Sequence, residues 1–140
     1  MSIRSVEPPE AHSEMSGGGE HVFLDVRTVA EFDAGHPAGA INIPWALKGV
    51  MGMSPNPDFL ATVQKHVPAG AKVFVSCKMG GRSMHACQQM EAAGYADLVN
   101  IDGGFGGRPD PDGGPGVTGW ADAGLPVENS SSTYEELTGG

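Results

Sequence analysis

Short runs of apolar residues, many of them β-branched or aromatic, recur along the chain. Residues 22–26, 40–43, 73–75 and 98–101 form such runs, and each is flanked by glycine, proline or polar residues. Continuous apolar runs of this length are typical of strands buried in a parallel sheet. Residues 3–6 are less apolar and predict at most a brief edge strand. The pattern therefore predicts about five strands.

Segments with helical spacing lie between these runs. Thr28 and Glu31 form a predicted capping box, and Gly35 ends the short helix that they start. The other predicted helices cover residues 10–15, 58–66 and 83–93. Strands that alternate with helices imply crossover connections, and hence an α/β fold in which one open parallel sheet carries helices on both faces.

Two stretches rich in glycine and proline interrupt this alternation. Residues 45–57 also contain Trp45 and several apolar side chains, and we predict a loop with a helical turn beside the functional site. Residues 102–119 are longer than an ordinary connection, which predicts a segment that is functional, flexible or both. Trp120 and Leu125 should anchor the chain to the body of the protein after this segment.

The balance of charge excludes some classes of partner. The chain has a formal net charge of −9 at pH 7 and no basic stripe, which argues against nucleic acid and anionic membranes as main partners. No apolar run approaches the length of a membrane span, so we expect a cytoplasmic protein. We expect a monomer with one domain over residues 1–127 and a flexible, polar and acidic tail over residues 128–140.

The cysteines and histidines limit the chemistry. Two cysteines do not make a disulfide framework, and the five histidines show no ligand spacing, so neither a metal nor another cofactor is predicted. Cys87 falls on an apolar helix face with Met84 and Met90, which predicts a core thiol. A resolving cysteine that closes a disulfide with Cys77 is the minor alternative.

Cys77 follows a buried strand and precedes a helix, with a tight loop between them. Glycines in the loop let backbone N–H groups turn inward, and the helix adds the positive end of its dipole. Such a cradle binds anions and favours the thiolate form of a cysteine at its centre. We therefore predict Cys77 as a nucleophile for an anionic substrate, in preference to a buried structural thiol. The loop residues predicted to bind the substrate are Lys78, Met79, Gly80, Gly81, Arg82 and Ser83.

Each of two further sites, the Asp25–Arg27 pair and Arg82, has two possible roles. Asp25 and Arg27 lie at the carboxyl end of a strand, where they could form an acid–base pair, but a structural ion pair of Arg27 with Glu31 or with Asp25 is favoured. Arg82 either faces the ligand or pairs with an acid to hold the loop, and this choice stays open.

The segment from Cys77 to Ser83 has the pattern Cys-x-x-Gly-x-Arg-Ser, which resembles the active-site loop of the single-domain rhodanese (thiosulfate sulfurtransferase) family. The family segment that usually reads Gly-His-Ile-Pro-Gly-Ala is here Gly-His-Pro-Ala-Gly-Ala, at residues 35–40, and this change bears on a local turn. Further segments that resemble the family, in the expected order, are residues 24–27, 31–36, 39–44, 93–95 and 102–104, with Trp120 downstream.

The resemblance implies a rhodanese-like fold and a sulfur transfer in two steps. Cys77 would take a sulfane sulfur from thiosulfate or a persulfide donor, and cyanide or a thiol would then remove it. Lys78 would attract the sulfonate end of the donor, and loop N–H groups would stabilise the persulfide anion.

Three alternatives to this enzyme remain. One is a persulfide carrier whose sulfur donor and acceptor are proteins, and another is a non-catalytic rhodanese-like interaction module. The third is a cysteine-based phosphatase or arsenate reductase. Those enzymes have five residues between the cysteine and the arginine, whereas four separate Cys77 from Arg82 here, and the narrower cradle suits a single sulfur atom.

Overall fold

The computed structural model describes residues 3–137, and a five-stranded parallel sheet forms its centre. The strand order is β1-β8-β7-β2-β4, so the brief N-terminal strand lies at one edge. The prediction of about five parallel strands is confirmed. The strands are β1 (Ile3–Val6), β2 (Val22–Asp25), β4 (Ile41–Asn42), β7 (Lys72–Ser76) and β8 (Asp97–Ile101).

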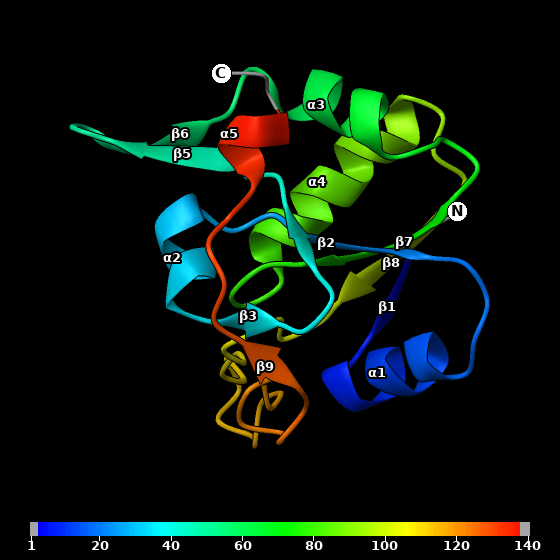
Figure 1. The fold of residues 1–140 in the computed structure, drawn as a ribbon. Coiled ribbons are helices and arrows are strands. Elements are labelled where there is room, and N and C mark those ends of the chain that lie inside the picture. The colour runs from blue at the N-terminus through cyan, green and yellow to red at the C-terminus, as the bar shows by residue number, and fades with distance from the viewer. Residues whose placement is uncertain (1–2, 138–140) are drawn as a thin grey trace.

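Helices cover both faces of this sheet, as predicted (Figure 1). One face carries α1 (Pro8–Ser16), and the other carries α3 (Phe59–His66) and α4 (Gly81–Ala92). Because successive side chains of a strand point to opposite faces, each strand supplies residues to two cores. In β7, for example, Phe74 packs on the face of α1, and its neighbours in the strand pack on the face of α3 and α4.

The carboxyl ends of the central strands lie at the same edge of the sheet. Asp25 pairs in register with Ser76, so β2 and β7 end side by side. The strand β8 ends at Ile101, next along the sheet, and Asp102 follows it directly. Parallel pairing therefore brings the segments that follow these three strands together, although they are far apart in the sequence.

The helix α2 (Val29–Ala34) has the start and the end that its sequence predicts. Thr28 Oγ1 accepts a hydrogen bond from the Glu31 N–H, and the Glu31 carboxylate accepts one from the Thr28 N–H. Gly35 caps the helix with a φ of 149°, in a region that favours glycine. No helix of residues 3–137 combines the length and the apolar character needed to cross a bilayer.

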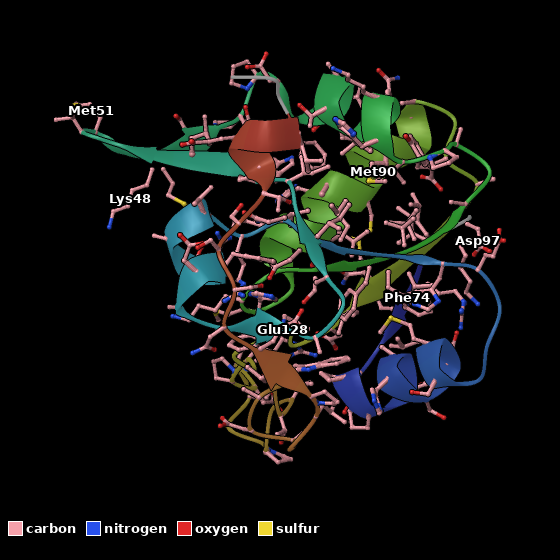
Figure 2. The ribbon with its side chains drawn as sticks, in the orientation of Figure 1. Lys48, Met51, Phe74, Met90, Asp97 and Glu128 are labelled. Atoms are coloured by element: carbon pink, nitrogen blue, oxygen red, sulfur yellow. The ribbon has the colours of Figure 1, made fainter. Side chains whose placement is uncertain are left out.

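The helical turn predicted within residues 45–57 is wrong, because this segment forms a β-hairpin. The antiparallel strands β5 (Ala46–Gly49) and β6 (Gly52–Pro55) are joined by a turn at Val50 and Met51. The hairpin projects away from the sheet, and the side chains at its tip are fully exposed (Figure 2). The sequence pattern failed here because strands exposed on both faces show no alternation of apolar and polar residues.

The segment after Trp120 returns to the body of the protein. The Trp120 side chain is buried and donates from Nε1 to the Pro126 carbonyl over 2.7 Å. The chain then forms β9 (Val127–Glu128), which pairs with β3 (His36–Pro37), and the short helix α5 (Tyr134–Leu137).

The predicted tail, residues 128–140, makes specific contacts as far as the structure describes it. The Ser132 N–H donates to the Asp33 carboxylate, and the Ser132 hydroxyl donates to Asn42 Oδ1 over 2.7 Å. The flexibility of this segment stays a prediction, and its last three residues lie outside the described part of the chain.

Candidate active site

Cys77 lies directly after β7, at the carboxyl edge of the sheet, and only 1% of the residue is exposed. The Gly80 N–H points back at the sulfur and donates to it over 3.0 Å. The Ser83 hydroxyl lies 3.4 Å from the same sulfur. A backbone donor and a hydroxyl thus meet the sulfur at the N-terminus of α4, and both groups are able to stabilise negative charge on it.

The turn of the loop depends on Gly80. Its φ of 122° lies in the region that side chains rarely adopt, and this conformation directs its N–H toward Cys77. A Cβ at this position would also lie 3.3 Å from the backbone nitrogen of Gly103, so little space is left for a side chain. The glycine predicted from the motif is therefore required for two reasons, its conformation and its close contact.

A second layer of backbone supports the loop from behind. The N–H groups of Gly103, Phe105 and Gly106 donate to the carbonyls of Met79, Cys77 and Lys78, over 3.0, 2.8 and 2.8 Å. These donors engage three consecutive carbonyl oxygens of the loop, whereas the Gly80 N–H is directed at the Cys77 sulfur. The stretch 102–119, predicted as functional, flexible or both, thus contributes its first residues to the support of the cysteine loop.

Gly104 lies where this supporting layer approaches the loop most closely. A Cβ at Gly104 would lie 2.2 Å from the Cys77 carbonyl oxygen, and its φ of 50° is positive as well. No side chain fits in this position without a shift of the backbone that carries the cysteine. The position of the Cys77 backbone therefore depends on the segment that follows β8.

Arg82 forms a bidentate ion pair with Glu31 of α2, with N–O distances of 2.8 and 3.0 Å. Burial opposes ionisation of Glu31, but the hydrogen bonds from Arg82 and Thr28 outweigh it and lower the pKa of Glu31 to about 2. The hydrogen bond that Arg82 donates to Glu31 in turn raises the pKa of Arg82. Of the two roles left open for Arg82, the structure shows the ion pair that holds the loop, and a contact with a ligand stays a prediction.

Asp25 and Arg27 form a buried ion pair beside the loop. Arg27 Nη2 lies 2.8 Å from the Asp25 carboxylate and 2.8 Å from the Gly35 carbonyl, and its guanidinium stacks over Phe105 at 4.4 Å. The guanidinium is thereby held by a carboxylate, a backbone carbonyl and an aromatic ring. This arrangement corresponds to the structural pair that the sequence favours, and it links the end of β2 to the segment that supports the cysteine loop.

Lys78 and Met79 lie on the outer side of the loop. Met79 is 46% exposed, and the Lys78 side chain is exposed, with its stem against Gly106. Within residues 3–137 we find no carboxylate paired with the Lys78 ammonium group. The position suits the predicted attraction of an anionic donor, which stays a prediction.

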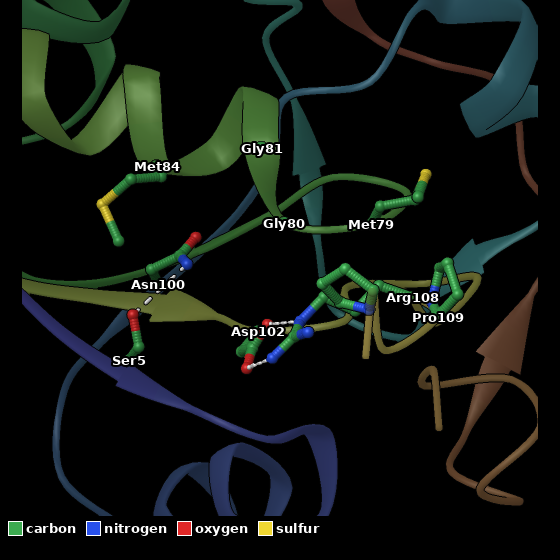
Figure 3. Close-up of a pocket in the computed structure, with 10 residues that line it drawn as sticks. Ser5, Met79, Gly80, Gly81, Met84, Asn100, Asp102, Arg108 and Pro109 are labelled. Carbon is green, nitrogen blue, oxygen red and sulfur yellow. Dashed lines mark hydrogen bonds and ion pairs between the residues drawn. The ribbon is translucent and has the colours of Figure 1, made fainter. Parts of the chain in front are cut away.

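A cavity of about 630 Å³ lies beside the loop (Figure 3). An ion pair between Asp102 and Arg108 closes one side of it, and the hydrogen bond from Arg108 lowers the pKa of Asp102. Asn100 and Ser5 lie on another side, joined by a hydrogen bond of 3.4 Å. The remaining lining residues are Met79, Gly80, Gly81, Met84, Pro109 and Pro111.

The partner of Ser83 is a buried residue that was not predicted from the sequence. Ser83 Oγ donates to Asn100 Oδ1 over 2.5 Å, and both residues are buried. Asn100 interrupts the apolar run of β8, and a polar residue inside a buried strand is the signal that could have identified it. Glu31, the acidic partner of Arg82, was predicted as a helix cap and as a possible partner of Arg27, but not as the partner of Arg82.

Cys87 belongs to the core cluster between the sheet and α4, as its helical spacing suggests. Burial raises the pKa of the Cys87 thiol to about 12, so it stays protonated near neutral pH. Both cysteines are free thiols. In the part of the chain that the structure describes, no cluster of histidine, cysteine and carboxylate side chains has the arrangement of a metal site.

The fold and the site define a class of protein: an open parallel α/β domain with a cysteine at the carboxyl edge of its sheet, whose sulfur accepts a hydrogen bond from a loop amide. Residues 8–107 match the family of the rhodanese-like domain. The chain belongs to this family, as the resemblance of its motifs implies.

Individual relatives agree with this assignment. Thiosulfate sulfurtransferase 16, chloroplastic, of Arabidopsis thaliana is 39% identical over 124 residues, which are 89% of this chain and 92% of that protein. The senescence-associated protein DIN1 of Raphanus sativus is 36% identical over 98 residues, 70% of this chain, but the chain spans only 53% of its length. The crystal structure of Rv0390 from M. tuberculosis is 30% identical and superposes with a TM-score of 0.74, covering 90% of this chain and 97% of that one.

Proposed function

We propose that the protein is a sulfurtransferase that carries a sulfane sulfur on Cys77, from thiosulfate or a persulfide donor to cyanide or a thiol. The main support is the cradle at the sulfur, where the Gly80 N–H lies 3.0 Å from Sγ at the start of α4. The curated relative named thiosulfate sulfurtransferase 16 shares 39% identity with the chain, and its name supports the same chemistry.

The reaction proceeds by two displacements at sulfur. The Cys77 thiolate attacks the outer sulfur of thiosulfate, a new S–S bond forms, and sulfite leaves with the electron pair of the old S–S bond. Cys77 then carries a persulfide anion, on which loop amides and the Ser83 hydroxyl act as donors. Cyanide or a thiolate attacks the outer sulfur and leaves the Cys77 thiolate, so atoms and electrons balance without a cofactor.

The position of Arg82 favours this reaction over phosphate or arsenate chemistry. An enzyme that holds a tetrahedral oxyanion needs the loop arginine to face the ligand. Here both terminal nitrogens of Arg82 are engaged by Glu31. The loop is also one residue shorter than in those enzymes, and both features support a site for a single sulfur atom.

We also propose an acceptor, a localisation and an oligomeric state. A thiol acceptor, small or on a protein, requires the same persulfide on Cys77. A monomer in the cytoplasm remains our expectation, although the relative described above is named as chloroplastic.

Steady-state transfer from thiosulfate to cyanide tests the proposed function. Wild type and Cys87→Ser should form thiocyanate at similar rates with ping-pong kinetics, because Cys87 lies in the core and does not react. Cys77→Ser should form none. Equal activity of Cys77→Ser and wild type would overturn the proposal.

Lys78 provides a second test, because its proposed role concerns only an anionic donor. Lys78→Ala should raise KM for thiosulfate by about tenfold, while Lys65→Ala on α3 should leave it unchanged. Unchanged thiosulfate kinetics in Lys78→Ala would refute the role of the ammonium group.

A further inference from the structure

The Ser83 hydroxyl lies between Cys77 and a buried amide that the cysteine motif does not include. Ser83 is completely buried, and Asn100 on β8 is only 4% exposed. Ser83 Oγ is 3.4 Å from the Cys77 sulfur and 2.5 Å from Asn100 Oδ1. The sulfur, the hydroxyl and the amide thus form one hydrogen-bonded row across the N-terminus of α4.

A hydroxyl has one proton, and three acceptors surround that of Ser83. Asn100 Oδ1 is nearest at 2.5 Å, the Gly80 carbonyl lies at 3.1 Å, and the Cys77 sulfur lies at 3.4 Å. When the proton points to Asn100, Ser83 presents its lone pairs to the sulfur and accepts from a thiol S–H. When the proton turns to the sulfur, the hydroxyl donates to a thiolate. The choice of acceptor thus decides which form of Cys77 is favoured.

Asn100 is held firmly in this position. Its backbone pairs in register with Val75 of β7 on one side and with Ser5 of β1 on the other. Its Nδ2 donates to the Ser5 hydroxyl over 3.4 Å, at the wall of the cavity beside the loop (Figure 3), and its Oδ1 accepts from the Ser83 hydroxyl. The amide is therefore a fixed acceptor and not a mobile side chain.

We propose that Asn100 is a positioning residue that competes with the Cys77 sulfur for the single hydroxyl proton of Ser83. This inference rests on the proposed function, in which Cys77 is the nucleophile. The Gly80 N–H and the positive end of α4 favour the thiolate, whereas Asn100 draws the Ser83 proton away and favours the thiol. An attacking thiol works best when it is half ionised near the ambient pH, and the two opposing effects allow such a balance.

Other charged and titratable groups also act on this sulfur, through space and not through the Ser83 proton. Arg82 and Cys87 of α4 interact with it electrostatically, and Glu31 of α2 neutralises Arg82. Substitutions of Asn100 and Ser83 leave these three groups unchanged. Differences in the Cys77 titration between such variants therefore report on Asn100 and Ser83. The remaining groups around the loop are Lys78, the Asp25–Arg27 pair at the end of β2, and the Asp102–Arg108 pair after β8.

The ultraviolet absorbance of the thiolate, followed against pH in the whole protein, measures this competition without any substrate. Cys87, with a pKa of about 12, does not ionise in the useful range, and the titration of Cys77→Ser supplies the baseline for the tyrosines. Asn100→Leu removes the competing acceptor and should lower the midpoint of the Cys77 titration by about one pH unit. Asn100→Asp strengthens the acceptor and should raise the midpoint by at least that amount.

The same substitutions in a Ser83→Ala background separate the proposal from a simple effect of charge or packing. Without the hydroxyl, Asn100→Leu should leave the midpoint unchanged, and the rise caused by Asn100→Asp should shrink to its through-space part. Equal shifts in the two backgrounds, or no shift on replacement of Asn100, would overturn the inference. If Asn100→Leu fails to fold, Asn100→Asp, which keeps the shape of the side chain, decides by the same comparison.

The titration is also independent of sulfur transfer. If Cys77 accepts sulfur from no donor, the proposed function fails while the coupling between Asn100 and Cys77 is still measured. Conversely, if sulfur transfer is normal and the midpoint of the Cys77 titration does not change when Asn100 is replaced, the role of Asn100 is refuted and the proposed function stands.

Discussion

Glu31 ties the cysteine loop to a neighbouring helix with a single side chain. Its carboxylate caps the N-terminus of α2 and accepts two hydrogen bonds from Arg82. The sequence alone reveals the cap, because Glu31 and Thr28 are neighbours on one helix, but it does not reveal the pair with Arg82. The ion pair joins residues 51 positions apart, and tertiary packing alone brings them together.

Glu31→Gln should lower the free energy of unfolding at neutral pH by about 1–2 kcal/mol, because a half-buried bidentate pair is lost. The pKa of Glu31 falls from 4.5 to about 2 on folding, so the carboxylate stabilises the fold above pH 4.5 and loses this effect as the pH falls toward 2. Urea unfolding at several pH values should therefore show the two proteins converging in acid. A difference that stays constant over this range, or one reproduced by the exposed control Glu20→Gln, would contradict this account.

Among the elements, the glycine-rich segment after β8 supports the cysteine loop by backbone hydrogen bonds. Three of its N–H groups hold three consecutive carbonyls of the loop. The segment looked like a long connection in the sequence, because glycine content shows conformational freedom but not which backbone lies nearby. The motif residues therefore predict the loop itself, and the structure adds the layer that shapes it.

Gly104→Ala tests this supporting layer, and Gly113→Ala is its matched control. Both glycines have positive φ, of 50° and 84°, but a Cβ at Gly113 meets no atom within 4 Å, whereas at Gly104 it would lie 2.2 Å from the Cys77 carbonyl oxygen. Gly104→Ala should displace the loop and lower transfer from thiosulfate by about 10²-fold. Gly113→Ala should cost about 1 kcal/mol of stability through backbone strain alone and keep full activity. Equal activities of the two variants would show that the close contact is unimportant.

The β5–β6 hairpin is an element that stands apart from the core. Val50 is 104% exposed and Met51 is 98% exposed, so neither contributes to packing. Neither residue has a positive φ, so replacing the pair by Ser-Asp, which suits a turn of this geometry, should leave stability and thiosulfate transfer unchanged. Thermal unfolding together with the transfer assay checks this, and a marked loss of either would mean that the tip packs against the body.

In the molecule as a whole, the elements that could be predicted from the sequence are those that are buried. Four of the five strands of the central sheet were located by their apolar runs, because a strand covered on both faces needs one, whereas the less apolar edge strand β1 was predicted only as a brief strand. The two small sheets were missed for the opposite reason. In β3 there are only two residues, one of which is Pro37, and the hairpin strands are exposed, so neither shows a periodic signal.

The site divides in the same way. Cys77, Gly80, Arg82 and Ser83 lie within one short motif, and its position between strand and helix was sufficient to predict a nucleophile in a cradle. Their partners come from other elements, with Glu31 on α2, Asn100 on β8 and the supporting glycines after it. Which of many polar residues meets the motif is decided by strand order and register, and these follow from the whole fold.

The intact mass of the protein after incubation with thiosulfate, without reductant, shows directly whether Cys77 carries sulfur. Wild type should gain the mass of one sulfur atom, and cyanide should remove it as thiocyanate is formed, while Cys77→Ser should gain nothing. Cys87→Ser should behave like wild type. A sulfur atom gained by Cys77→Ser, or none gained by wild type from either thiosulfate or a persulfide donor, would contradict the assignment of Cys77 as the sulfur carrier.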